Sequence, residues 1–236
     1  MELSRESKIV TFVFLLNTLI FVFLAIITKH TPVLEGPLFH YGVKGFLLTL
    51  NLFIYLAGFF GLLKARAWGG LKSVMGRTVG SLSLGMITWA TGNMIWVWYL
   101  FYANVEVPYP SLADAIFILS WPLWSYGVWN LSKATGAKFG LRTTGGKILL
   151  IIVPLICAVL SYYLLIIVAR GGVIDFNVDS IQLFFDLFYP FGSMVIFSIV
   201  GVVYLLSRNF LGGRYRMAIL LLFLGFLGNY ISDFTF

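Results

Sequence analysis

The side chains best suited to chemistry in this sequence are a few carboxylates and carboxamides set within long apolar runs. Asp186 and Asp233 each lie in such a run, and Asn93 lies in another. Charged groups are costly in an apolar medium, so they normally face the interior of a helix bundle, where they bind one another or a ligand. Asn229 and Asp233 are four residues apart and share a helix face. This pattern predicts a polar binding site.

Aromatic residues accompany these polar residues. Trp89, Asn93 and Trp96 share one face of a helix by their spacing, and Tyr189 follows Asp186 by three residues. Two interpretations are open: a belt of aromatic residues at the level of lipid headgroups, or the lining of a ligand pocket. The predicted pocket consists of Asn93, Trp89, Trp96, Asp114, Trp121, Asp186, Tyr189, Asn229 and Asp233.

Asp114 also has a purely structural interpretation. The segment Ser111-Leu112-Ala113-Asp114 follows Pro110 and precedes an apolar run. Its spacing is that of a capping box, in which the serine and the acid satisfy the first amide groups of a helix. We favour the cap, although a cap can also border a pocket.

The residues that enzymes and metalloproteins need are scarce. The two histidines, His30 and His40, both lie in one predicted connection, where with Glu35 they offer at most a weak metal site. The sequence has no HExxH motif, no phosphate-binding glycine loop and no serine–histidine pair within an apolar run. Its one cysteine, Cys157, is interpreted as an apolar side chain. We therefore expect no catalysis, no metal and no cofactor.

The composition indicates a membrane protein. Apolar residues make up 60% of the 236 residues and charged residues 11%, which are too few to cover a water-exposed surface. We expect an all-α, polytopic membrane helix bundle that forms a single transmembrane domain over residues 1–236. Each span needs about 20 apolar residues. The predicted seven spans are residues 9–27, 46–63, 79–102, 115–131, 148–169, 181–206 and 217–236.

The basic residues predict the orientation. Two lie before the first span, four in each of the second and fourth connections and three in the sixth, so 13 of the 16 fall on one side. Positively charged connections stay in the cytoplasm, which places the amino terminus inside and the carboxyl terminus outside the cell membrane. The net charge of +7 is thus a topology signal, with lipid rather than nucleic acid as the partner. By this orientation the predicted pocket faces outward.

Two of the predicted spans resemble each other. Gly85 precedes Asn93 by eight residues, and Gly225 precedes Asp233 by eight. The offset of 140 residues corresponds to four helices, so both copies would cross in the same direction. This favours a tandem repeat of four-helix units that lacks its last helix. Chance matches between apolar sequences are the alternative.

The stretch 108–129, PYPSLADAIFILSWPLWSYGVW, resembles a pattern in multi-helix membrane sensory domains. These domains precede GGDEF diguanylate cyclase and histidine-kinase modules in bacteria and have archaeal relatives. The pattern is matched further by Gly92-Asn93, by Asp186 with Tyr189 and Pro190, and by Ser232-Asp233. The resemblance covers roughly residues 80–236 and implies signal input without catalytic residues. Asn93 departs from the family's commoner acid. The family's final helix and effector module would come after Phe236, so we expect either a piece of a longer protein or a stand-alone relative that works with a partner.

Three functions remain open at this point. The first is a sensory or ligand-binding membrane module for a small or lipidic ligand. The second is an accessory subunit that scaffolds a larger membrane complex with a partner protein or further copies. The third is a small-solute transporter, suggested by the repeat and by Pro122 and Pro190 within spans, although the inner half of the bundle offers no polar lining.

Overall fold

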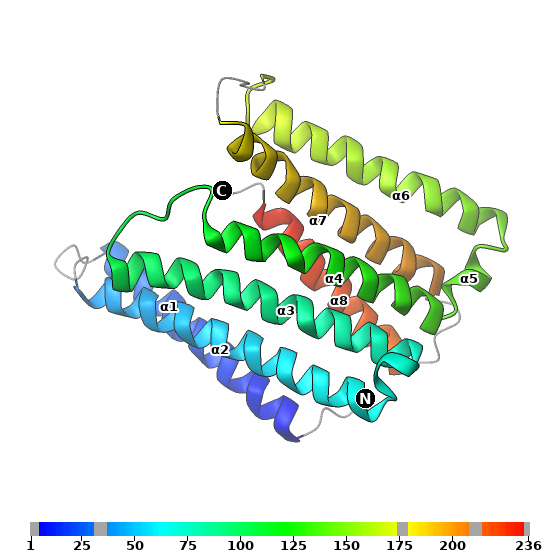
Figure 1. Cartoon of the computed structure of the whole chain (residues 1–236), viewed down its shortest axis with the longest axis horizontal. Coiled ribbons are helices and arrows are strands. Elements are labelled where there is room, and N and C mark those ends of the chain that lie inside the picture. The colour runs from blue at the N-terminus through cyan, green and yellow to red at the C-terminus, as the bar shows by residue number, and fades with distance from the viewer. Residues whose placement is uncertain (1–4, 31–36, 174–178, 208–213, 234–236) are drawn as a thin grey trace. The chain divides into compact units, whose positions relative to one another are not determined.

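The computed structural model describes residues 5–30, 37–173, 179–207 and 214–233, and every regular element within these ranges is helical (Figure 1). The all-α prediction is therefore confirmed for these residues. The elements are α1 (Arg5–His30), α2 (Pro37–Ala67), the 3-10 helix η2 (Gly70–Lys72), α3 (Val74–Trp98), the π-helix η3 (Tyr99–Ala103), α4 (Leu112–Ala134), α5 (Ala137–Gly140), α6 (Thr144–Tyr162), the π-helix η4 (Tyr163–Val168), α7 (Ser180–Ser207) and α8 (Arg214–Ser232).

Each of the seven predicted spans overlaps one long helix. The short helix α5, in the connection before α6, was not predicted. The last helix ends earlier than expected: α8 stops at Ser232 and Asp233 lies in a turn, whereas the prediction continued to residue 236. Residues 234–236 lie outside the described part of the chain.

Polar side chains and glycines fix the helix ends in the connections. Gly69 and Gly70 have φ values of +92° and +55°, which side chains with a Cβ rarely adopt, so the chain turns sharply after α2. Ser73 then accepts a hydrogen bond from the amide of Gly76 at 2.8 Å and caps α3. Thr143 caps α6 in the same way, through the amide of Gly146 at 3.0 Å.

The described residues form two compact units. One comprises residues 1–60 and 86–117. Within it, α1 packs against α2 through stacked rings of Phe21 and Phe46, whose centroids are 4.2 Å apart. The other comprises residues 61–85 and 118–236 and contains α5, α6, α7 and α8. In this second unit α7 lies alongside α6 and also contacts α8 (Figure 1).

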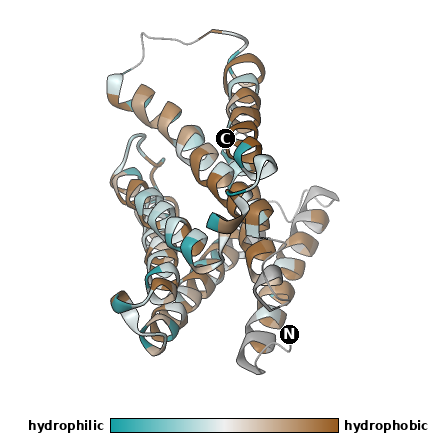
Figure 2. Ribbon diagram, turned by 90° about the vertical axis from the view of Figure 1, so that its right-hand side faces the viewer, coloured by the Kyte–Doolittle hydropathy of each residue, from teal (hydrophilic) through white to brown (hydrophobic). Residues whose placement is uncertain are grey.

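Three helical segments of the described chain, Gly42–Ala67, Thr144–Val168 and Ser180–Ser207, have the length and apolar composition needed to cross a membrane. Two further apolar helical segments, Thr11–Phe23 and Met217–Ser232, are shorter. Hydrophobic residues predominate along the helical ribbons (Figure 2).

Candidate functional site

A small polar cluster joins α7 to α8 in the second unit. Ser193 on α7 is 4% exposed, and its hydroxyl accepts a hydrogen bond of 2.9 Å from Asn229 Nδ2 on α8. The same side chain hydrogen-bonds the carboxyl group of Asp233. Oδ2 of Asp233 is buried and has no hydrogen-bond partner among the described residues. The cluster thus presents a carboxylate oxygen that can still accept a hydrogen bond.

Phe188 and Tyr189 precede Ser193 on α7, and their aromatic rings pack against a tryptophan of α4. Trp121 of α4 is 4% exposed, and its ring centroid lies 5.5 Å from that of Tyr189 and 6.2 Å from that of Phe188. Gly192 permits this approach, because a Cβ at that position would overlap the Trp121 indole. Trp121 and Tyr189, both predicted pocket residues, are therefore in contact. Ser193 of the polar cluster directly follows Gly192 in the sequence.

Asp186 has a specific partner of its own. Its Oδ2 lies 3.3 Å from a guanidinium nitrogen of Arg170, just beyond the π-helix η4, and the two side chains are 21% and 25% exposed. The ion pair ties the end of η4 to α7. Asp186 therefore contributes to holding two helices together, a role that its spacing in the sequence did not indicate.

Three predicted pocket residues lie on α3 in the first unit. Asn93 Nδ2 donates to the carbonyl of Trp89 in its own helix at 3.1 Å, and the ring of Trp89 lies 4.6 Å from that of Phe117. Nε1 of Trp96 is buried and has no hydrogen-bond partner in the described part of the chain. On α2, Asn51 is 2% exposed and its Oδ1 is likewise without a partner among those residues.

Asp114, also in the first unit, forms the predicted capping box. Its Oδ2 accepts hydrogen bonds from the amide of Ser111 at 2.7 Å and from the Ser111 hydroxyl at 2.9 Å. The hydroxyl in turn accepts from the amide of Ala113 at 3.2 Å. The capping interpretation is thus confirmed, and it accounts for a charged side chain that is only 3% exposed.

No protein-family model, curated protein or solved structure matches this chain.

The geometry therefore divides the predicted pocket into two sets of residues. The second unit brings Trp121 into contact with Tyr189 and joins Asn229 and Asp233 through Ser193. Asp186 also lies in the second unit, where it pairs with Arg170. The first unit holds the other four residues, which are Trp89, Asn93, Trp96 and Asp114.

Two residues of the second unit's site were not predicted. Ser193 is one of several serines in apolar helices, and a serine in such a run carries no signal comparable to that of a carboxylate. Arg170 was counted only as a charge in a connection. The proximity of Asp186 and Tyr189 on one helix could have suggested a local site, but not its cationic partner.

The described residues contain no group of three histidine, cysteine or acidic side chains close enough to hold a metal ion. The side chains of the weak candidate set, His30, His40 and Glu35, lie outside the described ones. The chemistry available to the Ser193 cluster is hydrogen bonding and charge, supplied by a hydroxyl, a carboxamide and a carboxylate.

Proposed function

We propose that this chain is a polytopic membrane protein of seven spans with its amino terminus in the cytoplasm and its carboxyl terminus outside. The observation that carries the proposal is the exposed apolar face of α6. Ile151 and Val159 on this helix are 68% and 62% exposed. Exposed apolar patches of this extent are unfavourable in water, whereas hydrocarbon solvates them at no cost.

Basic residues at the helix ends support the orientation. Lys138 and Arg142 are exposed and lie beside the ring of Phe139, at 5.2 Å from its centroid in each case. Basic side chains combined with an aromatic ring suit the boundary between headgroups and water on the cytoplasmic side.

Within this membrane protein we propose a sensory or ligand-binding role without catalysis. The supporting observation is the buried Oδ2 of Asp233, which lacks a partner among the described residues although Ser193 hydrogen-bonds the same carboxyl group. A buried polar atom without a partner costs free energy unless something binds it. A ligand bearing an N–H or O–H group, or a positive charge, would supply the missing hydrogen bond.

The ligand-binding proposal is tested by analysing what the protein carries out of its native membrane. The protein is purified in a mild detergent and denatured, and the released small molecules are identified by mass spectrometry. We expect a compound to be released from the wild type and to be lost from Asp233→Asn. Asp179→Asn, which neutralises an exposed aspartate just before α7, is the matched control and should retain the compound. Identical profiles for all three proteins would contradict the proposal.

An accessory role in a larger membrane complex is the second candidate. The exposed apolar face of α6 that favours lipid contact would equally suit another membrane helix. Chemical cross-linking in the native membrane, followed by purification, distinguishes the two roles. A partner protein cross-linked to α6 in stoichiometric amounts would favour the accessory role.

A further inference from the structure

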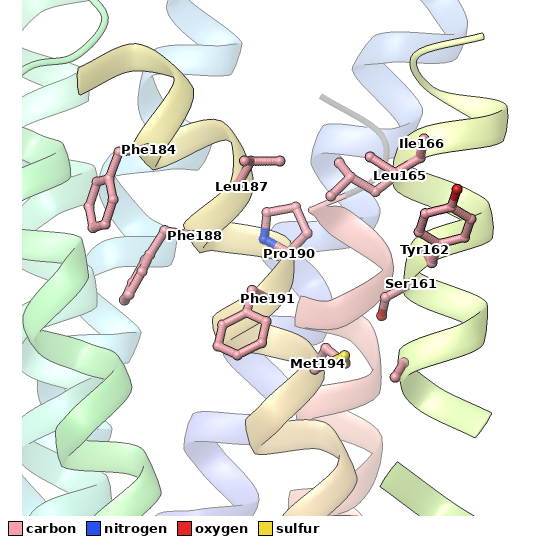
Figure 3. Close-up of a pocket in the computed structure, with 11 residues that line it drawn as sticks. Ser161, Tyr162, Leu165, Ile166, Phe184, Leu187, Phe188, Pro190, Phe191 and Met194 are labelled. Carbon is pink, nitrogen blue, oxygen red and sulfur yellow. The ribbon is translucent and has the colours of Figure 1, made fainter. Parts of the chain in front are cut away.

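The second unit contains a groove between two helical segments, with a volume of about 520 Å³. One wall is formed by the end of α6 and by η4, including Ala158, Tyr162 and Ile166. The other wall is formed by α7, including Leu187, Phe191 and Met194. Figure 3 shows these two rows of side chains on facing helical segments.

Backbone irregularities coincide with the groove on both walls. The π-helix η4 covers residues 163–168, which is an uncommon geometry that widens a helix locally. On the opposite wall Pro190 lies inside α7 and lines the groove, and a proline there removes one backbone hydrogen bond. The groove is therefore a product of the backbone as well as of side-chain size.

The lining selects an apolar occupant. Two of the lining residues carry a hydroxyl group: Ser161 hydrogen-bonds Tyr230 of α8 at 2.7 Å, and Tyr162 brings its phenol hydroxyl. The remaining surface consists almost entirely of aliphatic and aromatic carbon. A polar ligand would lose its hydrogen bonds to water there without gaining others, which is unfavourable. The groove's volume lies within the usual range for small-molecule sites.

The groove is elongated and opens to the side of the helix pair. Along α6 and η4 its lining extends from Ala158 to Ile166, which corresponds to roughly 12 Å at the rise of an α-helix. Three of its aromatic side chains, Tyr162, Phe184 and Phe191, are at least half exposed. An extended hydrocarbon chain entering from the bilayer fits this shape better than a compact ligand does.

A pair of opposite charges lies at one end of the groove. Arg170 follows Ile166 by four residues, and Asp186 directly precedes Leu187, so the 3.3 Å ion pair is within about one helical turn of both walls. Both side chains remain partly exposed. Together they complement a zwitterionic headgroup, whose phosphate would face the guanidinium group and whose ammonium group would face the carboxylate.

From this arrangement we propose that the groove binds one acyl chain of a zwitterionic phospholipid whose headgroup lies at the Arg170–Asp186 pair. The proposal rests on the proposed membrane embedding, but not on ligand binding at the Ser193 cluster. The lipid would fill the space between η4 and α7 and would stabilise the ion pair by excluding water from it.

Photo-cross-linking tests this assignment. The full chain is reconstituted in nanodiscs with phosphatidylethanolamine that carries a diazirine in one acyl chain, and the labelled residues are mapped by mass spectrometry. We expect labelling to concentrate at residues 158–166 and 184–194. Ala158→Trp, which fills the groove, should reduce it at least about fourfold, the equivalent of losing one buried CH₂ group. Val159→Trp, on the exposed face next to the groove, is the matched control and should leave it unchanged.

Competition tests the headgroup. Unlabelled phosphatidylethanolamine should displace the probe better than phosphatidylglycerol does in the wild type, and Arg170→Gln together with Asp186→Asn should abolish the difference. Circular dichroism and size-exclusion chromatography check folding, and Met194→Trp replaces Ala158→Trp if that variant fails to fold. Uniform labelling of all exposed helix faces, unchanged labelling in the filled variants, or occupation of the groove by a second polypeptide would overturn the proposal. Recovery of the protein from cells without detergent would instead refute the membrane embedding itself.

Discussion

Ser193 and Asn229 join α7 to α8 by a hydrogen bond of 2.9 Å, and the Ser193 side chain also hydrogen-bonds the carboxyl group of Asp233. One small hydroxyl thus connects Asn229 near the end of α8 with Asp233 in the turn that follows this helix. Because Ser193 is buried, the side chains of Asn229 and Asp233 both depend on its hydroxyl for these hydrogen bonds.

Replacing Ser193 by alanine should therefore destabilise the protein. We expect a loss of roughly 1–2 kcal/mol in the free energy of unfolding, because the substitution leaves both Asn229 and Asp233 without the shared hydroxyl. Titration with sodium dodecyl sulfate in mixed micelles measures this quantity. Ser198→Ala is the matched control, since Ser198 is also buried on α7 but donates to Val195 in its own helix. Equal losses in both variants would argue against an interhelical role for Ser193.

A second prediction concerns the contact between Gly192 and Trp121. Gly192→Ala should lower the free energy of unfolding by about 1–3 kcal/mol, because the added methyl group would overlap the buried indole. The same titration measures the effect. Combining the change with Trp121→Leu should restore part of the loss by removing the overlap.

Gly228 offers a control for the intrinsic effect of replacing glycine in a helix. Apart from its chain neighbours and the backbone of its own helix, no described residue has an atom within 4 Å of a Cβ built at this position. Gly228→Ala should thus leave stability unchanged or raise it by up to about 1 kcal/mol. If Gly192→Ala changed the free energy of unfolding no more than Gly228→Ala does, this would contradict the close approach of α4 and α7 at Trp121.

The capping box at the start of α4 gives a third prediction. Ser111→Ala should cost about 1 kcal/mol of stability, because the amide of Ala113 loses its acceptor and Asp114 loses one of its donors. Ser132→Ala, near the other end of α4, removes a hydroxyl that bonds the carbonyl of Trp129 within the same helix and should have a smaller effect. A full loss of ligand binding in Ser111→Ala without any loss of stability would instead assign this segment to a pocket.

The helices could be predicted from the sequence because each depends on a continuous apolar run, and the α4 cap could be predicted because its four residues are adjacent. The ion pair between Arg170 and Asp186 could not, since it joins separate helical segments and depends on which faces meet. The π-helix η4 also escaped prediction, because its sequence YLLIIV is as apolar as the preceding α-helix.

The candidate site was predicted only in part, for the same reason. Asn229 and Asp233 were recognised from their four-residue spacing, which is a property of one helix. Ser193, which connects them to α7, has no comparable signal in the sequence. Asp186 was recognised as unusual, but its partner determines its role, and the sequence does not reveal that partner.

The most direct test of the membrane embedding and orientation is labelling of single cysteines in intact cells. Starting from Cys157→Ser, Lys138→Cys and Asp179→Cys are each treated with a membrane-impermeant maleimide before and after permeabilisation. We expect Asp179→Cys to be labelled in intact cells and Lys138→Cys to be labelled only after permeabilisation. Labelling of Lys138→Cys in intact cells would contradict the orientation, and with it the outward location of the Ser193 cluster.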